Sequence, residues 1–108
     1  MLAPMASAQS AVKASMIAPT PGTTLRGPTA MFVWSAGSGA RAYELDLGNS
    51  VGASDILRQN ARLDTSLTVK SLPTDCRTVY VRLSTLLNSA WEFNDYTYKA
   101  CGSPAAPT

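Results

Sequence analysis

The 108-residue chain contains no histidine, no GxSxG motif and no glycine-rich loop leading into a helix pattern. Histidine is the side chain most used for proton transfer near neutral pH, and it is a common zinc ligand, so most hydrolase mechanisms and zinc sites are disfavoured. The missing motifs leave neither a serine triad nor a phosphate-binding loop. We therefore expect a protein that is not an enzyme and that uses no cofactor and no metal.

Clusters of positive charge and long apolar runs are also missing. Nine Lys or Arg and seven Asp or Glu give a formal net charge of +2, and no two basic residues are adjacent. A dispersed charge of this size lacks the basic patch that binds a phosphate backbone, so we expect no nucleic-acid partner. No apolar run approaches the roughly 18 residues that cross a bilayer, so we expect no membrane insertion.

What the chain does have is a period of two between turn signals. Pro- and Gly-rich segments such as Pro19-Thr20-Pro21-Gly22 divide it into short runs in which apolar and polar residues alternate. This pattern is typical of an all-β fold, and we expect a seven-stranded antiparallel β-sandwich. The expected strands lie at residues 15–18, 29–34, 42–47, 56–59, 66–70, 78–86 and 90–100.

The two ends differ from the middle in composition. Residues 1–18 are rich in Ala, Ser and Met, and we expect an extended N-terminal arm there. Residues 102–108 form a Pro/Ala-rich tail, which leaves one sandwich domain at residues 19–101. An arm of this length can donate a strand to the sheet edge of a neighbouring molecule.

Alternation assigns a face to each side chain, because successive residues of a strand point to opposite sides. The rule leaves Glu44 and Asp46 facing water. The expected inward side chains are Ala30, Phe32, Trp34, Tyr43, Leu45, Leu47, Leu67, Val69, Val79, Val81 and Leu83.

Two groups of oxygen-bearing side chains each allow a chemical and an ordinary interpretation. Glu44 and Asp46 resemble a glycosidase acid–base pair, but a solvated strand face is favoured because nothing apolar nearby would raise either pKa. Asn49, Asp55 and Asn60 offer oxygen ligands for calcium. Their spacing differs from that of an EF-hand, so ordinary loop polarity is favoured there too.

Apolar residues in outward positions form a candidate assembly surface. Met31 and Val33 face outward where a sandwich in water would usually carry Thr or Ser, and Met16 and Ile17 of the arm join them. Contacts of this kind between copies of one chain give filaments when they do not close into rings.

The two cysteines allow a disulfide or two reduced thiols in a cytosolic domain, and the last strand pair favours the disulfide. With Asn88 and Ser89 as the turn, the antiparallel register places Cys76 opposite Cys101. A disulfide there indicates an oxidising compartment. We therefore expect an extracellular or cell-surface location.

The same register creates a candidate binding face. It places Trp91 and Phe93 on the outer side, next to Tyr80 and Arg82, with Asp95 opposite Arg82. Aromatic rings edged by hydrogen-bonding groups suit a polysaccharide or a protein partner. The alternative is that a bulge at residues 94–95 turns Trp91 and Phe93 into the core.

A series of short motifs occurs in order along residues 19–100, and it includes Phe32-x-Trp34, Leu72-Pro73-Thr74-Asp75 and a final Asn94-Asp95-Tyr96-Thr97-Tyr98. Together they resemble fibronectin type III-like or immunoglobulin-like modules of secreted and surface proteins of bacteria. Such modules usually carry glycine where this chain has Cys76. They also begin the next strand with an inward tyrosine, whereas here Val79 faces in and Tyr80 faces out.

The expected function is a non-catalytic extracellular structural module of a bacterial surface or secreted protein, one that self-assembles through its N-terminal arm. Its expected partners are proteins, either copies of itself or neighbouring domains. One alternative is an adhesion module that binds carbohydrate or protein through the aromatic face. The other is an inert spacer domain, because one sandwich fold hosts many functions.

Overall fold

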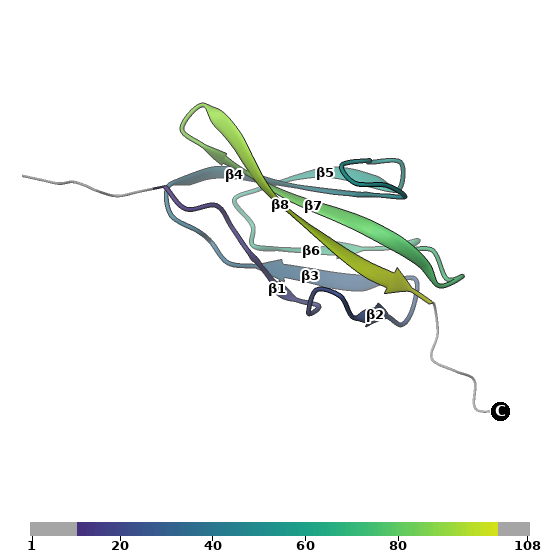
Figure 1. The fold of residues 1–108 in the computed structure, drawn as a ribbon. Helices are drawn as coiled ribbons and strands as arrows, with labels where there is room; N and C mark the ends of the chain where they lie inside the picture. The colour runs from purple at the N-terminus through teal and green to yellow at the C-terminus, as the bar shows by residue number, and fades with distance from the viewer. Residues whose placement is uncertain (1–10, 102–108) are drawn as a thin grey trace, which may run out of the picture.

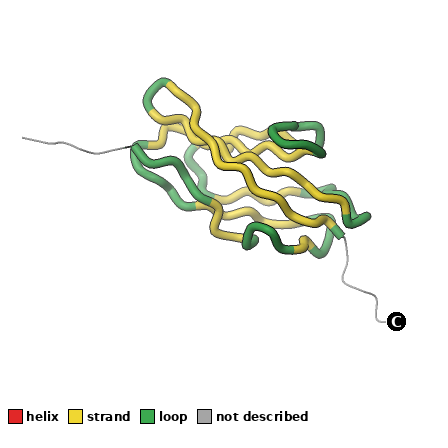
Figure 2. The backbone as a smooth tube through the Cα atoms, viewed as in Figure 1, coloured by secondary structure: helices red, strands yellow, loops and turns green. Residues whose placement is uncertain are grey.

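The computed structural model describes residues 11–101, and the regular secondary structure in that range consists of strands (Figure 1, Figure 2). The all-β sandwich is confirmed, with eight strands in place of the expected seven. The strands are β1 (Met16–Ala18), β2 (Thr24–Leu25), β3 (Ala30–Trp34), β4 (Ala40–Gly48), β5 (Leu57–Arg62), β6 (Ser66–Val69), β7 (Arg77–Leu87) and β8 (Ala90–Ala100).

The strands form two layers that enclose one core (Figure 1). The small sheet has three strands in the order β1-β3-β6, and the large sheet has five in the order β2-β8-β7-β4-β5. The additional strand is β2, which runs parallel to β8, with Leu25 opposite Ala100. Two residues between turn signals are too few to show alternation, so the sequence pattern did not reveal this strand.

The hairpin of β7 and β8 follows the predicted register. Its pairs run without a shift from Arg77 opposite Ala100 to Leu87 opposite Ala90. Asn88 in the turn adopts a φ of 56°, a left-handed conformation that asparagine tolerates better than most residues. The bulge that would have turned Trp91 and Phe93 inward is therefore absent from this pair of strands.

Four aromatic rings organise the core. Phe32 and Tyr98 meet edge to face with ring centroids 5.6 Å apart, and Trp34 and Tyr43 meet in the same way at 6.0 Å. The hydroxyl of Tyr98 donates a hydrogen bond of 2.8 Å to the carbonyl of Pro19. Burial raises the pKa of Tyr98, so this hydroxyl stays protonated and keeps its donor role.

The described part of the N-terminal arm lies against its own domain. Its strand β1 pairs with β3 in antiparallel fashion, and Val12 forms an isolated bridge with Ser38. The expected boundary between an arm of residues 1–18 and a sandwich domain remains a prediction, because residues 1–10 lie outside the described part of the chain, as do residues 102–108 of the tail.

Side chains of the hairpin hold this segment in place. The Ala14 amide donates to Oγ1 of Thr85 at 2.9 Å, and the Met16 amide donates to the hydroxyl of Tyr96 at 3.0 Å. Asn94 returns a bond from its side-chain amide to the Ala14 carbonyl at 2.9 Å. Many of the backbone hydrogen-bonding groups of residues 11–18 are therefore paired within the same chain.

Candidate binding face

The outer face of the large sheet carries the four residues of the candidate binding face. Trp91 and Phe93 are 45% and 43% exposed, so they belong to the surface and not to the core. Tyr80 and Arg82 lie on the same side because β7 and β8 are paired without a bulge. Val79 is buried while Tyr80 is partly exposed, as the alternation predicted.

Arg82 is the polar centre of this face. Its Nε and Nη2 atoms donate to the two carboxylate oxygens of Asp95 at 2.8 and 3.0 Å. Its guanidinium carbon also lies 3.7 Å from the ring centroid of Phe93, a cation–π contact. The hydrogen bonds to Asp95 raise the pKa of Arg82, so the group stays charged and fixed in orientation.

A row of alternating charges crosses four strands at this level. Asp46 of β4 stands between Arg82 of β7 and Arg58 of β5, and Asp95 of β8 completes the row. The prediction that Asp46 faces open water is wrong, because this residue is only 4% exposed. It points to the outer side as alternation requires, but Arg58 of the neighbouring strand donates to both of its carboxylate oxygens, at 3.3 and 3.5 Å.

The pKa of Glu44 is raised, so the expectation that nothing nearby would raise it is wrong. Burial raises the pKa of its carboxyl, the hydrogen bond and negative charge of Asp46 add to the rise, and the positive charge of Arg58 opposes it. The two carboxylates share Arg58, whose Nε lies 3.3 Å from an oxygen of each. Neither carboxylate lines the groove formed by Tyr80, Asp95 and Thr97.

A shallow groove of about 360 Å³ lies at the end of the face nearest the disulfide. The Gly22 amide donates to the Thr97 carbonyl at 2.8 Å, which holds the loop before β2 against β8. The groove is lined by Pro21, Gly22, Val51, Tyr80, Asp95, Tyr96 and Thr97. Sequence patterns could not find Pro21 and Val51, because they come from loops that carry no period.

The β4–β5 loop reaches the face through one glycine. Gly52 has a φ of +78°, and a Cβ atom there would lie 3.1 Å from Nη1 of Arg82. Glycine therefore allows this loop to lie directly against the guanidinium. The same loop places Val51 at the groove.

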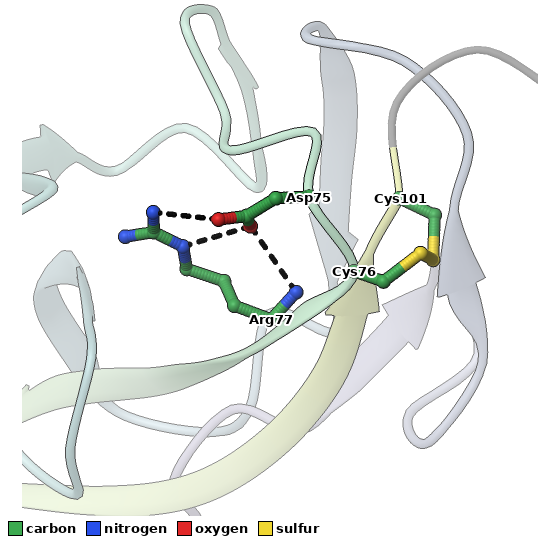
Figure 3. The surroundings of a disulfide bond; sticks show 4 residues. All are labelled: Asp75, Cys76, Arg77 and Cys101. Atoms are coloured by element: carbon green, nitrogen blue, oxygen red, sulfur yellow. Dashed lines mark hydrogen bonds and ion pairs between the residues drawn. A yellow bond between two sulfur atoms is a disulfide. The ribbon is translucent and has the colours of Figure 1, made fainter.

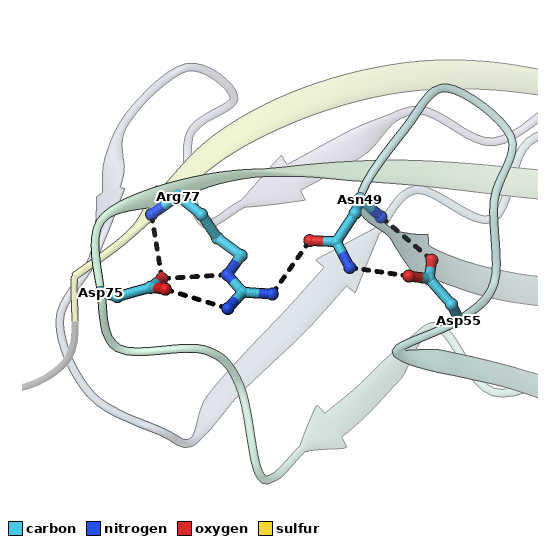
Figure 4. Close-up of polar contacts among 4 residues, drawn as sticks. All are labelled: Asn49, Asp55, Asp75 and Arg77. Atoms are coloured by element: carbon cyan, nitrogen blue, oxygen red, sulfur yellow. Dashed lines mark hydrogen bonds and ion pairs between the residues drawn. The ribbon is translucent and has the colours of Figure 1, made fainter.

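The residues considered for calcium do not gather around one point. Asn49 donates from its backbone and side-chain amides to the two Asp55 oxygens at 3.0 and 2.6 Å, and Arg77 donates to Oδ1 of Asn49 at 3.2 Å (Figure 4). Asn60 instead lies in β5 and accepts a bond from the Arg62 amide. These hydrogen bonds connect the β4–β5 loop to the start of β7.

The predicted disulfide joins Cys76 and Cys101, with an S–S distance of 2.11 Å (Figure 3). Cys76 has a φ of 67°, the left-handed conformation that favours glycine, which is the residue that the sequence resemblance leads us to expect there. Beside it, Arg77 donates two side-chain bonds of 2.9 Å to Asp75. These hydrogen bonds lower the pKa of Asp75 to about 2.

The candidate assembly surface is smaller than expected. Met16 is 8% exposed and packs into the core, so its place in that surface is a wrong prediction. Its neighbour Ile17 points outward, as do Met31 and the half-buried Val33 of β3. Because inward and outward positions alternate along β1, Met16 and Ile17 could not both belong to the outer surface.

Comparison with known proteins relates this arrangement to one solved fold. The chain is similar to the solution structure of a fibronectin type III domain derived from the human KIAA0970 protein, with a TM-score of 0.51 over 91% of this chain and 78% of that chain. The fold is a fibronectin type III-like β-sandwich. At 16% identity the likeness concerns the fold alone.

The fibronectin type III-like fold agrees with the resemblance seen in the sequence. No family model matches the chain, and no curated protein matches it. Within residues 11–101 there is no helix long and apolar enough to cross a membrane.

Proposed function

We propose that this chain is a non-catalytic extracellular module that attaches the protein carrying it to another molecule through the outer face of the large sheet. The observation that carries the proposal is the exposure of Trp91 and Phe93 on a regularly paired hairpin. Exposed aromatic side chains lose little conformational entropy on binding and are enriched at binding hot spots.

The disulfide supports the extracellular part of the proposal. Disulfides persist in oxidising compartments and are rare in the cytosol, and this one closes the hairpin that carries the face. Origin from a bacterial surface protein remains an expectation from the sequence resemblance.

Two other expected functions have less support. Self-assembly through the arm needs backbone groups that are free to pair with a neighbour, and residues 11–18 direct many of theirs to their own domain. An inert spacer leaves two exposed rings beside a fixed ion pair without a role. Adhesion through the aromatic face agrees with both the exposed rings and the hydrogen bonds of residues 11–18 within their own domain.

A bead-adhesion experiment tests the proposal. Beads coated with the chain are applied to immobilised collagen, fibrinogen, cellulose, chitin, dextran and peptidoglycan. We expect the wild type to adhere to at least one surface and the Trp91→Ala/Phe93→Ala variant to lose that adhesion. Met31→Ala is the matched control, because Met31 is 57% exposed but lies on the small sheet. No adhesion by the wild type, or equal adhesion by the double variant, would contradict the proposal.

A further inference from the structure

The binding face is a long strip and not a round patch. Trp91, Phe93, Asp95 and Thr97 occupy successive outward positions of β8. Neighbouring positions on one side of a strand are about 7 Å apart, so the strip extends about 20 Å from Trp91 to Thr97. The groove that contains Tyr80 lies at the Thr97 end. An elongated ligand fits this shape better than a compact one.

The two charges in the middle of the strip neutralise each other. Arg82 donates to both carboxylate oxygens of Asp95. An anionic or cationic ligand would have to displace one of these partners, whereas an uncharged ligand leaves them in place. Electrostatic complementarity therefore favours a neutral ligand.

The fixed pair still has hydrogen-bonding capacity. Each carboxylate oxygen of Asp95 accepts one bond from Arg82 and retains a further lone pair, because an ionised carboxylate has about four acceptor sites. Tyr80 and Thr97, which both carry hydroxyl groups, line the same groove. Polar groups held in position beside an aromatic ring suit a ligand with hydroxyl groups on its edges and apolar C–H faces.

A protein partner fits the centre of the strip less well. The central region of a protein–protein interface is depleted in charged residues, whereas the centre here is the ion pair of Arg82 and Asp95. The groove of about 360 Å³ is instead within the size range of small-molecule subsites. These observations favour a saccharide over a folded protein as the ligand of the strip.

We infer that the ligand of this face is a neutral polysaccharide, which lies along β8 with one sugar ring over Trp91 and another in the groove beside Tyr80 and Asp95. The inference rests on the proposed binding function and names the class of ligand. Trp91 supplies the open ring, because the guanidinium of Arg82 stacks on Phe93. Asp95 and Tyr80 orient the hydroxyl groups.

Titration of the full chain with cellohexaose, chitohexaose and mannohexaose tests the inference, with oligogalacturonate and a heparin hexasaccharide as charged comparators. The chain has only two tryptophans, and Trp34 is buried, so a change in tryptophan emission on binding reports on Trp91. We expect at least one neutral hexasaccharide to bind. In isothermal titration calorimetry, which needs no tryptophan signal, Trp91→Ala and Tyr80→Ala should each weaken that binding about tenfold or more, while Met31→Ala leaves it unchanged.

Amide chemical shifts of the wild type provide a readout that does not depend on any variant. Shifts on ligand addition should be largest at Tyr80, Trp91 and Thr97 and absent at Met31. No binding of any neutral hexasaccharide, binding of the charged comparators alone, or shifts centred on Met31 would overturn the inference. Adhesion of coated beads to collagen or fibrinogen alone would overturn it as well, while leaving the proposed adhesion function intact.

Discussion

The β7–β8 hairpin and the N-terminal segment 11–25 both complete the sandwich, but different interactions hold them. The hairpin has an unbroken ladder between strands adjacent in sequence, and a disulfide closes its open end. The N-terminal segment crosses from the edge of the small sheet to the edge of the large one, and its two strands have three and two residues. Such short ladders cannot order a segment by themselves.

The N-terminal segment forms several of its hydrogen bonds with the hairpin. The acceptors for the amides of Ala14, Met16 and Gly22 are the Thr85 hydroxyl, the Tyr96 hydroxyl and the Thr97 carbonyl. Lys13 also donates from its ammonium group to the Phe93 carbonyl at 2.9 Å. The hairpin therefore has its partners within one local unit, and we expect the segment to lose its order when its contacts with the hairpin are broken.

Removing the disulfide should have the largest effect. The double variant Cys76→Ser/Cys101→Ser should lower the free energy of unfolding by roughly 3 to 4 kcal/mol, because an open chain gains entropy in the unfolded state. Urea denaturation followed by fluorescence measures the loss. Wild type treated with dithiothreitol should then behave like the variant, and an unchanged urea midpoint for the variant would contradict the prediction.

The second prediction is that one substitution destabilises the N-terminal segment more than the hairpin. Thr85→Val keeps the side-chain shape but leaves the buried Ala14 amide without an acceptor, which should cost about 1 to 3 kcal/mol. Hydrogen exchange should accelerate at Ala14 and Met16 much more than at Val81.

The control for this variant is Thr78→Val, on the same strand, whose side chain forms no hydrogen bond to the segment within the described residues. If Val81 lost as much protection as Ala14 in Thr85→Val, the two regions would form one cooperative unit. The proposed dependence of the segment on the hairpin would then be wrong.

Breaking the ion pair across the hairpin should have a smaller effect. Asp95→Asn should lower stability by less than about 1 kcal/mol, because partly exposed ion pairs contribute little and the backbone ladder remains. The loss should shrink in high salt, as thermal unfolding at two ionic strengths would show. Asp64→Asn is the matched control, since Asp64 is exposed and forms no ion pair among residues 11–101. A salt-independent loss would contradict this account.

The smallest expected effect is a change of stability at acid pH, caused by Asp75 at the disulfide end of the hairpin. The pKa of Asp75 is lowered from 3.8 to about 2, chiefly by hydrogen bonds from Arg77, so the folded state binds fewer protons there than the unfolded state. The resulting stabilisation is present above pH 4 and is lost as the pH falls towards 2. Both partners are exposed, so solvent screens the effect.

Urea midpoints of wild type and Asp75→Asn between pH 6 and pH 2 would measure it. The variant should lose less stability on acidification than the wild type. Glu44 acts in the opposite direction, because its pKa is raised and protonation favours the folded state, and comparing the two proteins cancels its contribution. Identical acid profiles would show that the Asp75–Arg77 pair is irrelevant to stability.

Most of the candidate site could be predicted because it lies on one hairpin. Tyr80, Arg82, Trp91 and Phe93 fall on one face as soon as the turn position and the period of two are known. The groove beside them could not be predicted in this way. Pro21 and Val51 reach it from loops whose paths depend on packing against β8 and on the glycine beside Arg82.

The sequence by itself determined which side chains alternate, where the hairpin turns and which cysteines meet, because these follow from neighbours along one or two strands. Only the tertiary structure decided that Asp46 is buried on the outer face and that Met16 belongs to the core. It also decided that β2 joins the large sheet. Burial depends on which distant segments cover a residue, and the local period of two carries no information about that.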